Sequence, residues 1–188
     1  MSRRRSSSAA RRVPYRGGRA LAFLLVLAAL VLLRVLQQDS SSVAPETLEE
    51  GTYRVERVVD GDTLLLANGA RIRLQGVDTP ETVKPNHPVE PFGPEATEFT
   101  RRFVAQGNGA VRLQFDRERL DKYGRFLAYV WVGARMLNEE LVRAGLATAE
   151  LQYRYSSTMK TRFRRAEEEA EAAARGIWSS RAAASDGL

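Results

Sequence analysis

Three short runs rich in β-branched residues, joined by tight turns, constrain the fold of this chain most strongly. Residues 53–59 alternate with a period of two, as a half-buried strand does. Residues 63–66 and 71–77 flank Asn68-Gly69, a dipeptide that favours the turn of a β-hairpin. The pattern therefore predicts three successive antiparallel strands.

After a proline-rich loop at 79–94, the sequence predicts two more strands and the helices of the same domain. We expect a helix at 94–106, strands at 111–115 and 126–132, a short helix at 137–144, and a long helix whose apolar stripe runs from Met159 to Ile177. Five short strands with about three appended helices predict an α+β fold on a five-stranded barrel of the OB-fold type, although other α+β folds also fit the pattern.

An apolar run at residues 20–36 follows a strongly basic segment. Only Arg34 interrupts the run, and seven arginines precede it. Its length suits a short transmembrane helix, and the arginine bias places the N-terminus in the cytoplasm and the rest of the chain outside. A cleaved signal peptide is the alternative, but the site after Ala44 is followed by Pro45, which disfavours cleavage.

The expected organisation follows from these features. We assign a basic segment to 1–19, a transmembrane anchor or signal peptide to 20–36, a linker to 37–51, one domain to 52–179 and a tail to 180–188. The domain is then anchored outside the cytoplasm, or secreted if the leader is cleaved.

The net charge of +6 belongs to the leader. Residues 1–42 hold eight of the 29 Lys and Arg residues and one of the 23 Asp and Glu residues, so the remainder has 21 basic and 22 acidic residues. Bulk charge therefore does not identify the partner of the domain.

The composition also limits the metal chemistry. The chain has no cysteine and a single histidine, which excludes thiolate sites and a zinc site built from imidazoles within one chain. Any metal ion must be held by oxygen, which favours calcium, magnesium or manganese. The histidine, His87, lies in the proline-rich loop, and we do not expect it to act as a base.

Acids and arginines recur at predicted turns and strand ends, where side chains can converge. The three clusters are VVDGDT at 58–63, RLQGVDTPE at 73–81 and LDKYGRFLAYV at 120–130. Each alone also fits an ordinary surface turn, because Asp, Gly and Pro are common turn residues.

Together the three clusters resemble the staphylococcal nuclease (thermonuclease) family. GPEA at 93–96, NEELVRAGLA at 138–147 and Gly176-Ile177-Trp178 are similar to that family in the same order. The resemblance covers roughly residues 53–179, and agreement over so many ordered segments is far less expected by chance than any single motif.

The resemblance implies a calcium site and a general base. Asp62 and Asp78, with the backbone carbonyl of Thr79, correspond to the calcium ligands, and Glu81 corresponds to the proposed base. Calcium accepts about six to eight oxygen ligands, which leaves room for water and a phosphate oxygen. Glu81 is then expected to take a proton from the attacking water.

The resemblance also implies a set of substrate-binding residues. Arg73 and Arg125 correspond to two phosphate-binding arginines, whose planar guanidinium groups suit the charge that develops on phosphorus. Lys122 and Tyr123 match positions that contact a terminal phosphate of the bound nucleotide. Tyr153 is expected to contact the base, together with Leu151 in an ungapped reading or with Tyr155 after a two-residue shift.

The implied function is a calcium-dependent nuclease that hydrolyses phosphodiester bonds of DNA, RNA or both outside the cytoplasm. The first alternative is a non-catalytic nucleic-acid-binding module of the same fold, tethered to the membrane through residues 20–36. A further alternative is an adaptor that binds a sugar or a peptide. The intact acids and both arginines favour catalysis; no protein partner is indicated, and a monomer is expected.

Overall fold

A computed structural model describes Val26, residues 44–82 and residues 89–179. Apart from Val26, the predicted segments at 1–19 and 20–36 lie outside the described residues, as do His87 and the tail at 180–188. No helix within the described residues is both long enough and apolar enough to cross a membrane. Of the two units into which the chain divides, the one from Ser42 to Leu188 contains every described strand.

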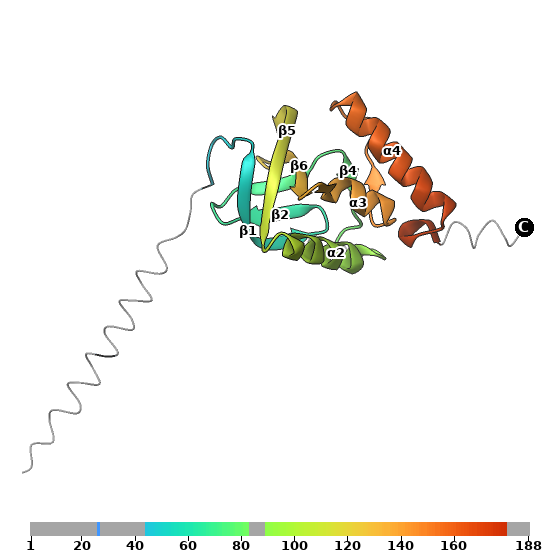
Figure 1. Ribbon diagram of the computed structural model, residues 1–188, viewed down its shortest axis with the longest axis horizontal. Coiled ribbons are helices and arrows are strands. Elements are labelled where there is room, and N and C mark those ends of the chain that lie inside the picture. The colour runs from blue at the N-terminus through green and yellow to red at the C-terminus, as the bar shows by residue number, and fades with distance from the viewer. Residues whose placement is uncertain (1–25, 27–43, 83–88, 180–188) are drawn as a thin grey trace, which may run out of the picture. The chain divides into compact units, whose positions relative to one another are not determined.

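Five strands close into a barrel (Figure 1). They are β1 (Gly51–Asp60), β2 (Thr63–Leu66), β3 (Arg71–Leu74), β5 (Ala110–Leu120) and β6 (Phe126–Val132). Neighbours pair antiparallel in the order β3-β2-β1-β5-β6, and β3 also pairs in parallel with β6, which closes the sheet. The five-stranded barrel expected from the sequence is confirmed.

The hairpin between β2 and β3 forms at the predicted turn. Gly69 has a positive φ of 82°, which a side chain would disfavour. The Asn68 side chain accepts a hydrogen bond from the N–H of Ala70 at 3.1 Å. The Asn-Gly pair therefore supplies both the backbone freedom and the local hydrogen bond that this turn needs.

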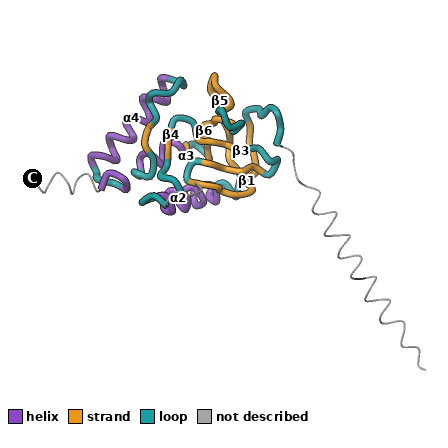
Figure 2. The backbone as a smooth tube through the Cα atoms, turned by 180° about the vertical axis from the view of Figure 1, so that it is seen from behind, coloured by secondary structure: helices purple, strands orange, loops and turns teal. Residues whose placement is uncertain are grey.

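In the described residues, helices cover the outside of the barrel (Figure 2). They are α2 (Gly93–Gln106), α3 (Leu137–Arg143), α4 (Ser157–Ala172) and the 3₁₀ helix η1 (Gly176–Trp178), with the short strand β7 (Arg135–Met136) between β6 and α3. α2 packs against β1, and α3 packs against both β6 and α4. Phe103 of α2 and Phe163 of α4 reach the core and are at most 1% exposed.

The run predicted as one strand at 71–77 is interrupted at Gly76. Its φ of +74° and a site where an added Cβ would lie 2.6 Å from the Tyr155 ring both require glycine. The chain then forms β4 (Val77–Asp78), which pairs antiparallel with β8 (Thr148–Ala149) in a separate two-stranded sheet. Asp78 is therefore held outside the barrel sheet.

Two further boundaries differ from the sequence predictions. Leu48 falls in the segment assigned to the linker, but it is 4% exposed and belongs to the core. The last helix ends at Ala172 instead of reaching Ile177, because the chain turns at Ala174, whose φ is +48°. The N–H of Ile177 then donates to the carbonyl of Gly145 at 2.9 Å. Apolar spacing alone did not reveal this turn.

Asp116 joins β5 to the start of α4. β5 continues past the predicted end at residue 115, and Asp116 Oδ2 accepts from the Tyr129 hydroxyl at 2.8 Å and from the Ser156 N–H at 2.6 Å. Burial alone would raise the pKa of Asp116, but the hydrogen bonds from the backbone N–H groups of Arg117 and Ser156 outweigh it and hold the pKa below its ordinary value.

We expect Asp116→Ala to lower the free energy of unfolding by about 2–4 kcal/mol near pH 7, because it leaves three donors without their acceptor. The lowered folded-state pKa means that this contribution is present above the unfolded-state pKa of about 3.9 and is lost as the pH falls through the folded-state value. Urea unfolding at about pH 7 and about pH 3 measures both effects. An equal loss at both pH values would contradict a role for the charged carboxylate.

Candidate active site

Asp62 is a buried acid at the centre of the site. It lies in the turn between β1 and β2 and is 6% exposed. Its Oδ2 accepts hydrogen bonds from the N–H and the hydroxyl of Thr79, at 3.0 and 2.9 Å, and its Oδ1 accepts from the Thr63 hydroxyl at 3.0 Å. Gly61 permits this approach, since a Cβ there would lie 2.7 Å from Thr79 Oγ1. The turn thus binds the segment that follows β4.

Arg73 bridges Asp62 and Asp78. Its Nη1 lies 2.8 Å from Asp62 Oδ2, and its Nη2 lies 2.6 Å from Asp78 Oδ1. Nη1 also donates to the carbonyl of Val77 at 2.8 Å. The side chains of Arg73 and Asp62 are 12% and 8% exposed, whereas that of Asp78 is 56% exposed. One guanidinium therefore holds two carboxylates from different segments close together.

Further negative charge surrounds this bridge. Burial raises the pKa of Asp78; Arg73 opposes this effect, and the like charges of Asp62 and Glu81 add to it. Burial also raises the pKa of Asp60 to about 6, with Asp62 and Glu81 acting in the same direction. An added cation would stabilise the ionised forms of these acids, so the electrostatics favour a cation site.

The donors at this place fit a hard cation. No group of three or more His, Cys, Asp or Glu side chains in the described part of the chain is arranged to hold a metal ion. The carboxylates at this place are those of Asp62 and Asp78, which both contact Arg73, and the carbonyl of Thr79 follows Asp78 directly in the chain. All of these donors are oxygen atoms, and calcium completes such a partial set with water or phosphate oxygen.

Arg125 is held by Asp121. Its Nε lies 2.7 Å from Asp121 Oδ2, while Asp121 Oδ1 accepts from the backbone N–H groups of Arg125 and Tyr123 at 3.0 and 2.8 Å. Burial would raise the pKa of Asp121, but the hydrogen bonds from Arg125 outweigh it and lower the pKa. Among the described residues, Nη1 and Nη2 of Arg125 have no ion-pair partner. Both remain available to a ligand.

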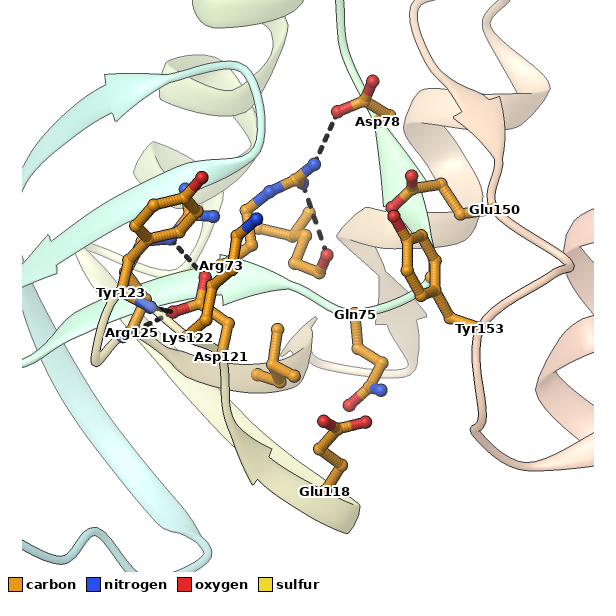
Figure 3. A pocket seen from close by; sticks show the side chains of 13 residues that line it. Arg73, Gln75, Asp78, Glu118, Asp121, Lys122, Tyr123, Arg125, Glu150 and Tyr153 are labelled. Atoms are coloured by element: carbon orange, nitrogen blue, oxygen red, sulfur yellow. Dashed lines mark hydrogen bonds and ion pairs between the residues drawn. The ribbon is translucent and has the colours of Figure 1, made fainter.

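A pocket of about 500 Å³ brings six of the predicted site residues together (Figure 3). They are Arg73, Asp78, Lys122, Tyr123, Arg125 and Tyr153. Figure 3 shows Tyr123 and Arg125 on one side of the pocket and Asp78 and Tyr153 on the other, with Arg73 between them. Arg73 therefore reaches this cavity from β3, and Arg125 reaches it from the position directly before β6.

The other predicted residues lie beside the pocket without lining it. Asp62 and Thr79 lie behind Arg73 through the contacts given above. The backbone N–H of Glu81 donates to Glu90 Oε2 at 3.0 Å, and the Glu81 carbonyl accepts from the Glu90 N–H at 2.9 Å. These two bonds fix the Glu81 backbone next to the acids.

The tyrosines of the 150–157 segment are separated by the fold. Tyr153 lines the pocket and is 56% exposed. Tyr155 packs against Phe163, with ring centroids 6.0 Å apart, and does not line this pocket. Leu151 does not line it either. Tyr153 is thus the residue of this segment placed to touch a ligand.

Four further polar residues that line the pocket were not assigned a role from the sequence. They are Gln75, Glu118, Asp121 and Glu150. Burial raises the pKa of Glu150, and the nearby Asp78 adds to the effect. Asp121 and Gln75 lie inside the motif segments, close in sequence to Arg125 and Arg73. That closeness could have indicated from the sequence that they belong to the site. Glu118 lies outside the motifs and had none.

A closed barrel with an acid- and arginine-lined pocket at its strand ends defines a barrel protein of the OB-fold type. The model for staphylococcal nuclease homologues matches residues 71–180. A thermonuclease from Staphylococcus hyicus is 42% identical over 163 residues, which cover 83% of this chain and 95% of that relative. The chain belongs to the staphylococcal nuclease family.

Two further relatives agree with this assignment. A thermonuclease from Staphylococcus intermedius is 46% identical over 130 residues, covering 68% of this chain and 76% of the relative. Endonuclease YncB of Bacillus subtilis is 40% identical over 129 residues, covering 66% of this chain and 60% of the relative. The predicted family resemblance is confirmed.

The bridge at Arg73 predicts unequal effects of removing its two acids. Asp62→Ala should lower the free energy of unfolding by about 3–5 kcal/mol, because it leaves two Thr79 donors without their acceptor and removes the buried one of the two carboxylates that pair with Arg73. Asp78→Ala, at an exposed carboxylate, should cost about 0–1 kcal/mol. Urea unfolding in a calcium chelator compares the variants without bound metal. Similar losses in both would contradict the buried role of Asp62.

Proposed function

We propose that this protein is a calcium-dependent nuclease that hydrolyses phosphodiester bonds of DNA, RNA or both. The observation that carries the proposal is the pocket in which Arg73 and Arg125 meet beside the acids Asp62 and Asp78. The names of the relatives, thermonuclease and endonuclease, support it. The substrate is then a nucleic acid whose phosphate lies between the two arginines.

Asp62, Asp78 and the Thr79 carbonyl are the residues that would hold calcium. When bound, a hard cation of this kind supplies Lewis-acid stabilisation of a phosphate oxygen and a source of nucleophilic water. The oxygen-only donor set and the raised pKa of Asp78 support this assignment. Arg73 holds both carboxylates close together, and a cation bound to them would take over its charge and release its Nη donors for the phosphate.

The two arginines bind and stabilise the reacting phosphate. Arg125 keeps Nε on Asp121 and directs its remaining donors to the ligand. Arg73 is 12% exposed, so its charge acts where water screens it little. Attack on phosphorus adds negative charge to the phosphate oxygens, and paired N–H donors stabilise that charge more than they stabilise the ground state.

Glu81 is the proposed general base. Its backbone is tied to Glu90, and its charge acts on both Asp60 and Asp78. A carboxylate at this place accepts the proton of the attacking water as the O–P bond forms, and the leaving oxygen departs on the other side of phosphorus. General-base catalysis of this kind contributes about 10²–10⁴-fold.

The remaining pocket residues bind the nucleotide. Lys122 and Tyr123 are the residues for a terminal phosphate, and Tyr153, which is 56% exposed, offers an aromatic face. Exposed aromatic rings are suited to stacking on bases.

We further propose that the enzyme acts as a monomer outside the cytoplasm, anchored through residues 20–36, because that run is apolar and follows seven arginines.

One assay tests the activity and its metal requirement. The full-length protein is incubated with single-stranded DNA, duplex DNA and RNA, with calcium or with a calcium chelator. We expect cleavage with calcium and none with the chelator. Binding without cleavage in calcium would establish a non-catalytic module instead, and cleavage in the chelator would refute the calcium requirement.

Replacement of either arginine by lysine tests the phosphate role. We expect Arg73→Lys and Arg125→Lys to lower kcat by about 10²–10³-fold, because lysine keeps the charge but loses the paired donors. Steady-state cleavage of a short oligonucleotide measures kcat, and Arg101→Lys, on the exposed face of α2, is the matched control. Near-native rates in either variant would refute the assignment.

The roles of Glu81 and Asp78 are separable by metal affinity. Glu81→Ala should reduce cleavage by about 10²–10⁴-fold and leave calcium affinity nearly unchanged, since its task is proton transfer. Asp78→Ala should weaken calcium binding, because it removes a charged ligand. Calorimetric titration with calcium compares the two. Equal loss of calcium affinity in both variants would undo this division of roles.

A further inference from the structure

A second pocket, of about 1010 Å³, lies between the far part of β5 and the start of α4. Figure 1 shows these two ends on the same side of the barrel. One wall of the second pocket is residues 116–118 of β5, and the other comes from residues 154–160, which include the first turn of α4. The proposed function uses none of the residues that line only this pocket.

The second pocket adjoins the first, which holds Arg73 and Arg125. Glu118 lines both pockets, and along the chain Tyr153 lines the first and Arg154 lines the second. Figure 3 shows Glu118 at the lower edge of the first pocket, away from Asp78. A ligand that is too long for the first pocket therefore continues past Glu118 into the second.

The charge of the second pocket is opposite to that of the first. Three basic side chains line it, Arg117, Arg154 and Lys160, against the two acidic side chains of Asp116 and Glu118. The Asp116 carboxylate already accepts three hydrogen bonds, from the Tyr129 hydroxyl and the N–H groups of Arg117 and Ser156. The lining is therefore net positive without any bound cation, and it favours an anionic ligand.

Two of the three basic side chains remain available to such a ligand. Arg117 and Arg154 are exposed, and within the described part of the chain neither forms an ion pair. Lys160 is engaged, because its Nζ donates to the carbonyl of Leu151 at 2.7 Å and lies 5.1 Å from the centre of the Tyr155 ring. Lys160 thus holds the 151–155 segment in place, and the two arginines from opposite walls supply the free donors.

We propose that Arg117 and Arg154 bind phosphates of the nucleic-acid strand beyond the nucleotide held in the first pocket. This inference rests on the proposed nuclease function and extends its substrate to a strand several nucleotides long. With one phosphate at Arg73 and Arg125 and a base against Tyr153, the strand continues past Glu118 into the second pocket. Phosphate contacts position a strand without reading its bases, so they favour length over sequence.

Equilibrium binding of a short and a longer single strand tests the proposal. Fluorescence anisotropy compares a dinucleotide with a strand of about eight nucleotides, within the usual site size of an OB-fold. The full-length protein carries Glu81→Ala and is studied in calcium, and electrophoresis verifies that the strand stays whole. We expect the longer strand to bind more tightly, with an affinity that falls more steeply with salt by about 0.7 in log–log slope for each added phosphate contact. Equal slopes would overturn the inference.

The double variant Arg117→Gln, Arg154→Gln tests the two residues directly. It should fold, because both side chains are exposed and have no ion-pair partner among the described residues. We expect its affinity for the longer strand to fall about fivefold to twentyfold and its salt slope to become shallower by about 1.4. Dinucleotide binding should stay within about twofold. An unchanged affinity for the longer strand, or an equal loss for the dinucleotide, would overturn the assignment.

Two matched variants separate a local phosphate contact from a general effect of charge. Arg117→Lys with Arg154→Lys keeps both charges and should keep the salt slope. Arg101→Gln with Arg102→Gln removes the same charge from the exposed face of α2, outside both pockets, and should change neither affinity. An effect of this second pair as large as that of Arg117→Gln with Arg154→Gln would overturn the role of the second pocket.

Two further outcomes separate this inference from other functions. An octapeptide of glutamate that displaces the longer strand as well as the unlabelled strand does would assign the pocket to acidic peptides and overturn the proposal. Cleavage by the parent protein with length-independent binding would refute this inference and leave the nuclease function standing. Length-dependent binding that both arginines carry, without any cleavage by the parent protein, would refute the nuclease function and leave the strand-binding role of the second pocket.

Discussion

The parallel pairing of β3 with β6 is the contact on which both the barrel and the pocket depend. It sets Ile72 beside Phe126 and Arg73 beside Leu127. Because Arg125 directly precedes Phe126, the pairing that closes the barrel also brings the two arginines into one cavity. A shift of one residue in this register would exchange the two faces of the strand and turn Arg73 away from the pocket.

The end of β3 converts this closed sheet into a site. At Gly76 the chain leaves the barrel and continues in β4, which β8 holds in a separate sheet. Arg73 spans this break, with contacts to Asp62 on one side and to Val77 and Asp78 on the other. The barrel strands position Arg73, and the irregular segment after Gly76 carries Asp78. Functional residues on irregular segments that a regular scaffold positions are common in proteins.

Local signals allowed part of this structure to be predicted. Alternation and an Asn-Gly turn gave β1 to β3, because both are properties of neighbouring residues. The extension of β5 to Leu120 and the turn at Ala174 were missed, since the first depends on distant partners of Asp116 and the second breaks a spacing that still looks helical.

The family motifs identified the arginines and acids of the site. They did not reveal that Asp121 orients Arg125, because this contact is not visible without the packing.

Under the proposed function, the charges that line the pocket explain why a cation and a polyanion would bind together. Three basic side chains line it, Arg73, Lys122 and Arg125, against four acidic ones, Asp78, Glu118, Asp121 and Glu150. Residues 1–42 carry the basic excess of the chain, so the remaining residues have no net positive charge to attract nucleic acid. A phosphate that enters alone meets a net negative lining, and a divalent cation at Asp62 and Asp78 reverses its sign. Under the proposed function, calcium and nucleotide must therefore strengthen one another's binding, and by linkage each does so by the same factor.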